Sequence, residues 1–118
     1  MRINTIYLLL LLLTSCYSPP QIDGFDQTKW ENSEPCSAYR IETADFLEVH
    51  ESELQGFIQK EIDDFLGNNR KHQLDKRNGQ FFLYPITVDC GDSIPNTSLS
   101  LMFDALGRVK EVQVVLVD

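Results

Sequence analysis

The chain has few basic side chains and few residues suited to metal binding. Its 118 residues hold 10 lysines and arginines against 18 aspartates and glutamates, and the formal net charge is -8. Nucleic-acid binding and attachment to anionic lipid headgroups both need clustered basic residues, so this charge balance argues against both. Only two histidines and three cysteines are present, and no Cys-x-x-Cys or His-x-x-x-His spacing occurs. The sequence therefore predicts no metal site, no cofactor and no nucleic-acid partner.

Recognisable catalytic motifs are also missing. His50 and His72 stand in no known signature with a cysteine, and no glycine-rich loop that could hold a phosphate occurs. General acid–base catalysis needs two groups whose environments separate their pKa values, and nothing in the sequence locates such a pair. We therefore expect a protein without catalytic residues that is not an enzyme.

No apolar run is long enough to cross a membrane. Residues 6–13 form the longest run, and its eight residues compare with the roughly 20 that a spanning helix needs. This length, after the single basic residue Arg2, is typical of the apolar region of an export signal. Residues 13–16, Leu-Thr-Ser-Cys, resemble the bacterial lipobox, which implies signal cleavage after residue 15 and acylation of Cys16. A plain secretory signal with a free Cys16, or a short membrane helix, is the alternative.

Three regions follow from this assignment. Residues 1–15 are expected to be a lipoprotein signal peptide, and residues 16–24 the lipidated cysteine with a flexible tether, since they include two prolines and no apolar periodicity. Residues 25–118 are long enough for one domain, and we expect them to form a single α+β domain with an N-terminal aromatic arm. Tyr17 differs from the aspartate that retains many lipoproteins in the inner membrane of Gram-negative cells. We therefore expect a bacterial cell-envelope protein that is lipid-anchored at the outer membrane and faces the periplasm.

Two cysteines remain once Cys16 is assigned to the lipid anchor. An even pair in an exported chain is most simply a disulfide, because the compartment outside the cytoplasm is oxidising. The sequence predicts a Cys36–Cys90 bond. A reactive thiol and a metal ligand are the alternatives.

The hydrophobic periodicity changes from helical to strand-like near Gly67. Before it, Ile58, Ile62, Phe65 and Leu66 form one apolar stripe, and a break at Gln55–Gly56 predicts two helices. After it, the period is two. Three strands are predicted: residues 80–88, with 82, 84, 86 and 88 on one face; residues 98–103, with 99, 101 and 103 inward; and residues 109–117, with 112, 114 and 116 inward. A weaker strand is predicted at residues 71–75. An Asn78–Gly79 hairpin turn would join it to the strand at 80–88. The expected fold is α+β in two layers, with two N-terminal helices packed on a three- to four-stranded antiparallel β-meander.

An aromatic segment precedes the first predicted helix. Residues 25–40 hold the single tryptophan, Trp30, together with Phe25 and Cys36. One interpretation is an arm whose aromatic rings pack on the edge of the domain, fixed there by Cys36. The other is an aromatic surface that binds a ligand or a partner through Trp30. This segment resembles a group of small bacterial lipoproteins, which have Phe-Asp, Trp, Cys and Arg in the same order as Phe25-Asp26, Trp30, Cys36 and Arg40.

Two further segments resemble the SmpA/OmlA family of small outer-membrane lipoproteins. Residues 56–67 are similar to a family segment in which a glycine is followed by eight to ten residues and then by Leu-Gly. Residues 103–109 are similar to the closing hairpin of the family, Phe-Asp-x-x-Gly-x-Val. The family includes a subunit of the outer-membrane β-barrel assembly machinery, and its fold is similar to that of β-lactamase inhibitor proteins. The resemblance implies a non-enzymatic module that docks on a protein partner.

The predicted strand 80–88 is apolar on both faces. Because the helices can cover only one face, Phe81 and Leu83 are expected to form part of an exposed surface for an envelope protein, with Trp30 as a further candidate. The first hypothesis is therefore a protein-binding module of the envelope, in outer-membrane assembly or maintenance. The alternatives are an inhibitor of an envelope hydrolase and a lipoprotein that binds a small ligand between helices and sheet.

Overall fold

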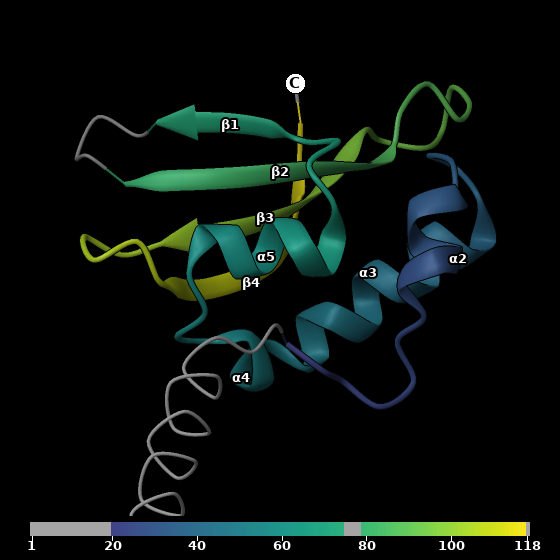
Figure 1. Ribbon diagram of the computed structural model, residues 1–118. Coiled ribbons are helices and arrows are strands. Elements are labelled where there is room, and N and C mark those ends of the chain that lie inside the picture. The colour runs from purple at the N-terminus through teal and green to yellow at the C-terminus, as the bar shows by residue number, and fades with distance from the viewer. Residues whose placement is uncertain (1–19, 75–78, 118) are drawn as a thin grey trace, which may run out of the picture.

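The computed structural model describes residues 20–74 and 79–117. The helices are α2 (Gln27–Asn32), α3 (Ala38–Val49), α4 (Glu51–Leu54) and α5 (Gln59–Leu66), and the strands are β1 (Lys71–Leu74), β2 (Gln80–Thr87), β3 (Thr97–Phe103) and β4 (Val109–Leu116). The strands form one antiparallel sheet in the order β1-β2-β3-β4. The helices come before the sheet in the chain and lie on one side of it (Figure 1). The predicted α+β class and the four-stranded meander are confirmed.

Helix α5 presents the predicted apolar stripe to the sheet. Ile62, Phe65 and Leu66 are buried, whereas Ile58 precedes the first turn and is partly exposed. The Ile58 backbone N–H donates to the Glu61 carboxylate at 3.0 Å, which satisfies one of the free N–H groups at the start of the helix. The helix ends at Gly67, whose φ of 83° belongs to the left-handed region that glycine adopts without strain. The predicted end of this helix is confirmed.

The preceding helical region is more divided than the sequence indicates. The predicted break at Gln55–Gly56 is present, but a second one at His50 separates α3 from α4. The aromatic segment contains a further helix, α2, which the hydrophobic pattern of the sequence does not indicate. Asp26 caps it by accepting from the Lys29 backbone N–H at 3.1 Å. Tertiary packing of Trp30 stabilises this six-residue helix, which is too short to be stable alone.

The core lies between the helices and one face of the sheet. Alternation along β2 and β3 directs Phe82, Tyr84 and Ile86, and then Leu99, Leu101 and Phe103, toward the helices, as predicted. Val88, which was predicted on the same face as Phe82, Tyr84 and Ile86, follows the end of β2 and is exposed. Leu116, which was predicted inward, is 75% exposed. Leu116 is the last residue of β4 and pairs with the first residue of β3, so it lies at the end of the sheet beyond the core.

The predicted disulfide is present. Cys36 and Cys90 are bonded, with Cα atoms 5.7 Å apart and a sequence separation of 54 residues. The backbone N–H of Cys36 also donates to the Ile86 carbonyl at 2.8 Å. These contacts attach the segment before α3 to the end of β2.

The described chain begins in contact with the helices. Pro20 and Ile22 are buried, and the Phe25 ring lies 4.3 Å from the Phe65 ring, centroid to centroid. Residues 20–24, the last part of the predicted tether, pack on the helices, and Ile22 adds apolar surface to the core. The predicted signal peptide, Cys16 and Asn78 of the predicted turn lie outside the described residues. Within residues 20–74 and 79–117, no helix is both long and apolar enough to cross a membrane.

Candidate docking surface on the sheet

The second face of the sheet is not covered by a helix. Alternation along β2 and β3 directs a different set of side chains to this side, and the strand register pairs Phe81 with Met102, Leu83 with Ser100 and Pro85 with Ser98. We call this set the free sheet face; its six residues are Phe81, Leu83, Pro85, Ser98, Ser100 and Met102. Phe81, Leu83, Pro85 and Met102 are half-buried, although nothing in the described chain packs over them as a layer. The predicted placement of Phe81 and Leu83 on the face opposite the helices is consistent with this arrangement.

The two serines form the floor of a trough. Ser98 and Ser100 are only 8% and 7% exposed, although they carry small side chains on the helix-free side. Each is flanked by larger residues on both neighbouring strands: Ser100 by Leu83 and Gln113, and Ser98 by Pro85 and Val115. Small residues between two rows of larger ones make the surface concave. The sequence shows this alternation of serines, but not which side chains flank them.

The trough continues into a pocket of about 520 Å³ at the end of β2. Its wall includes Leu83, Pro85 and Ser98 of the free sheet face, together with Arg70 and Lys71. Lys71 pairs with Leu83 and therefore lies on the helix-free side, whereas the Arg70 guanidinium binds Asp63 of α5 on the helical side. The lining contains no carboxylate. We call this pocket the edge groove. It is unusual in a chain with a net charge of -8.

The two central strands carry no charged residue. Their sequences are QFFLYPIT in β2 and TSLSLMF in β3, so the acidic side chains of the domain lie on the helices, the loops and β4. Depletion of charge with retention of aromatic and apolar residues is typical of the centre of protein interfaces. The arrangement suits contact with another protein better than acid–base chemistry.

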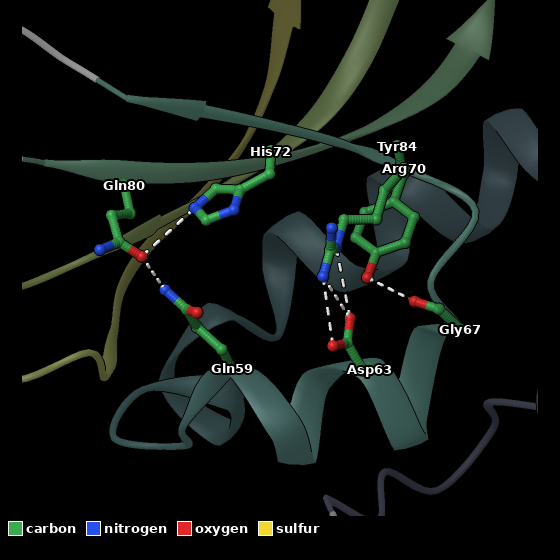
Figure 2. A network of polar contacts seen from close by, with 7 residues as sticks. All are labelled: Gln59, Asp63, Gly67, Arg70, His72, Gln80 and Tyr84. Atoms are coloured by element: carbon green, nitrogen blue, oxygen red, sulfur yellow. Dashed lines mark hydrogen bonds and ion pairs between the residues drawn. The ribbon is translucent and has the colours of Figure 1, made fainter.

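A polar network holds β1 and the preceding residue, Arg70, against α5 (Figure 2). The Arg70 guanidinium donates to the Asp63 carboxylate at 2.9 Å and lies 3.6 Å from the centroid of the Phe82 ring. Beside it, the Tyr84 hydroxyl donates to the Gly67 carbonyl at 2.8 Å. Burial, and then the charge of Asp63, raise the pKa of Tyr84 well above its usual range. Tyr84 is therefore a neutral hydrogen-bond donor and not a candidate acid or base at neutral pH.

The second part of this network joins three amide or imidazole side chains. His72 of β1 lies 3.3 Å from the Gln80 amide oxygen, which also accepts from the Gln59 side chain of α5. The His72 ring packs edge-on against Phe82, with centroids 5.2 Å apart. His72 is exposed and contacts no carboxylate in these hydrogen bonds, so its role here is to position β1.

Trp30 is in the core and not on the surface, which corrects its assignment to a partner surface. The side chain is 1% exposed, and its indole N–H donates to the Leu66 carbonyl at 3.0 Å. The Arg40 guanidinium carbon lies over the Trp30 ring, 4.2 Å from its centroid. The packed-arm interpretation of the aromatic segment is the one that agrees with this burial.

Arg40 is a buried cation with few partners. One terminal nitrogen donates to the Ser33 carbonyl at 2.9 Å, and the Nε atom has no hydrogen-bond partner among the described residues. Burial lowers the pKa of Arg40, which nonetheless stays charged at neutral pH. Its contact with Trp30 explains why these two residues occur together in the segment.

Side chains and loop backbone of the helical layer occupy the outer edge of β4. The backbone N–H groups of Val112 and Val114 donate to the carboxylates of Glu51, at 2.7 Å, and Glu48, at 2.6 Å. Earlier in β4, the Val109 backbone exchanges hydrogen bonds with Gly56 and Phe57. An edge strand closed in this way cannot accept a further strand. The sequence gives no signal for these caps, because they join residues more than 60 positions apart.

No group of three or more histidine, cysteine, aspartate or glutamate residues in the described part of the chain could hold a metal ion. Comparison with protein families, with curated proteins and with solved structures gives no match to this sequence or fold.

Proposed function

We propose that this chain is a lipid-anchored, non-enzymatic protein-binding module of the bacterial cell envelope, and that it docks on its partner through the free sheet face. The observation that carries the proposal is a concave, charge-free surface on two central strands, with Phe81, Leu83 and Met102 around a serine floor. Exposed apolar surfaces of this kind mark interaction sites in soluble domains. The resemblance of residues 56–67 and 103–109 to the SmpA/OmlA lipoproteins agrees with a docking role in outer-membrane assembly or maintenance.

The position of the chain start supports an orientation for the anchored domain. Acylated Cys16 stands four residues before Pro20, and four extended residues span at most about 14 Å. The described chain then packs on the helical layer, where Gly24 lies beside Phe46 and Phe25 contacts Phe65. The anchor therefore enters on the helical side, and the free sheet face points away from the membrane toward the periplasm.

Capture of the partner from intact cells tests the proposal. Full-length protein with a C-terminal tag would be crosslinked in its own host, and the captured proteins identified from the membrane fraction. We expect a defined envelope complex with the wild type, and its loss with the double variant Phe81→Ser/Leu83→Ser. The matched control is Val49→Ser/Leu106→Ser, which removes two highly exposed apolar side chains elsewhere and should leave capture unchanged.

Two results would contradict docking through this face. One is undiminished capture by a folded Phe81→Ser/Leu83→Ser protein. The other is unfolding of that variant, as followed by circular dichroism, because it would make these residues part of the core. Replacing Cys16 by Ala tests the anchor separately: we expect the protein to move from the membrane to the soluble periplasmic fraction.

A further inference from the structure

The two outer edges of the sheet differ in what occupies them. The β4 edge is closed by the carboxylates of Glu48 and Glu51 and by the backbone at Gly56 and Phe57. At the opposite edge, β1 pairs with β2 alone, and no backbone of another described element pairs with its outer side. All four residues of β1 are exposed. We call the outer side of β1 the open edge.

An open edge offers backbone hydrogen bonds in a fixed direction. In an antiparallel ladder, the N–H and C=O groups of alternate residues point to each side, so about half of those in Lys71–Leu74 point outward. An extended segment of another chain can pair with such groups and continue the sheet. The contacts of Arg70 with Asp63 and of His72 with Gln80 hold β1 in place before any partner arrives.

The edge groove lies beside this open edge, on the helix-free side. Lys71 and Gln73 of β1 line it together with Leu83 and Pro85 of β2. A strand added to β1 would direct every second side chain toward the same side, next to Lys71 and Gln73. The floor there is apolar, and Lys71 is the lining cation on this side, because the Arg70 guanidinium binds Asp63 on the helical side. These features complement a segment that alternates apolar and acidic residues.

We propose that β1 binds an acidic, extended segment of the partner by strand addition, with its side chains entering the edge groove. This inference rests on the proposed function, because it names the part of the partner that reaches the domain. A second copy of the chain fits less well at this edge, because its β1 sequence, KHQL, contains no acidic residue that could pair with Lys71.

Selection from a phage-displayed library of random ten-residue peptides provides the probe. The periplasmic domain with its disulfide intact would be the target. We expect enriched peptides that are acidic, that alternate apolar residues, and that slow hydrogen exchange of the amides in residues 71–74. Lys71→Glu should weaken their binding about tenfold, whereas Lys110→Glu, a charge reversal on exposed β4, should leave it within twofold.

Several results would overturn strand addition at β1. They are no enrichment over an unrelated protein, enriched peptides without acidic bias, protection only of amides outside β1, or equal effects of the two lysine variants. A dimer in sedimentation experiments that is lost on Lys71→Glu would assign the open edge to a second copy instead. If Lys71→Glu leaves partner capture intact while Phe81→Ser/Leu83→Ser abolishes it, the free sheet face is the docking site and β1 is not.

Discussion

At the scale of single residues, the aromatic segment is explained by burial. Trp30 is bounded by the Arg40 guanidinium, by Phe25 and by Tyr84, and its N–H is bonded to the backbone of α5. A fully buried tryptophan stabilises the fold by removing its apolar surface from water and by the hydrogen bond of its indole N–H. It has no free surface for a partner.

The variant Trp30→Ala measures this contribution. Truncating a fully buried tryptophan removes apolar area and leaves a cavity, so we expect the free energy of unfolding to fall by about 3–5 kcal/mol in urea denaturation. Val49→Ala, at a highly exposed helical position, is the control and should change it by less than about 0.5 kcal/mol. A loss below about 1 kcal/mol for Trp30→Ala would show that the ring is not in the core.

The raised pKa of Tyr84 predicts that the free energy of unfolding falls at alkaline pH. Its pKa is raised in the folded protein by burial and by Asp63, so the unfolded chain loses the phenolic proton first, near pH 10. Below that pH its contribution is constant. Above it, the unfolded state binds fewer protons, and the free energy of unfolding falls by up to about 1.4 kcal/mol per pH unit from this group.

The comparison with Tyr84→Phe isolates this effect. The variant lacks the hydrogen bond to Gly67 and should be less stable at pH 7, but its free energy of unfolding should decline less steeply between pH 10 and 11.5. Chemical denaturation at a series of pH values provides the slopes. Equal slopes for the two proteins would contradict a raised pKa of Tyr84.

At the scale of elements, the strands follow from the sequence more closely than the helices do. The period of two in residues 80–87 and 97–103 identifies both the strands and their buried faces. Helix α2 could not be predicted in the same way, because its six residues contain one apolar residue and depend on the packing of Trp30. The break at His50 has no glycine or proline to mark it. The predictions failed for Val88 and Leu116 because periodicity does not indicate where the helical cover ends.

The candidate surface was predictable only in part. Phe81 and Leu83 stand out because they interrupt the alternation of a half-buried strand. The contribution of Pro85, Ser98 and Met102 depends on the strand register, which the chain acquires only when the sheet forms. The caps on β4 and the position of Lys71 in the edge groove are likewise products of tertiary packing.

Removing the two carboxylates that cap the outer edge of β4 should destabilise that edge. In Glu48→Ala/Glu51→Ala, the N–H groups of Val112 and Val114 lose charged acceptors, so we expect unfolding to cost about 1–3 kcal/mol less and these two amides to exchange faster. The freed edge should also raise the tendency to self-associate, as seen by light scattering. Glu42→Ala, at an exposed position of α3, the helix that also contains Glu48, is the control. Unchanged exchange at Val112 and Val114 would contradict the capping.

At the scale of the whole molecule, the Cys36–Cys90 bond joins the helical layer to the end of β2. It closes a loop of about 55 residues, which corresponds to a stabilisation on the order of 4 kcal/mol in the chain-entropy model. We expect the double variant Cys36→Ser/Cys90→Ser to lose a stability of this order in urea denaturation. The wild type treated with reductant should behave like the variant, and a difference below about 1 kcal/mol between oxidised and reduced protein would contradict a stabilising bond.

The layered arrangement gives the molecule two unlike sides. The chain enters on the helical side, and the sheet presents its charge-free trough on the other. A domain anchored by its N-terminus would therefore hold its docking surface toward the periplasm.

Photocrosslinking in living cells tests this account most directly. A benzophenone amino acid would replace Phe81 on the free sheet face or, in a second strain, Val49 on the helical side, in the full-length anchored protein. We predict a crosslinked product of one defined size from position 81 and none from position 49. Products from position 49 alone, or from neither position, would contradict docking through the sheet.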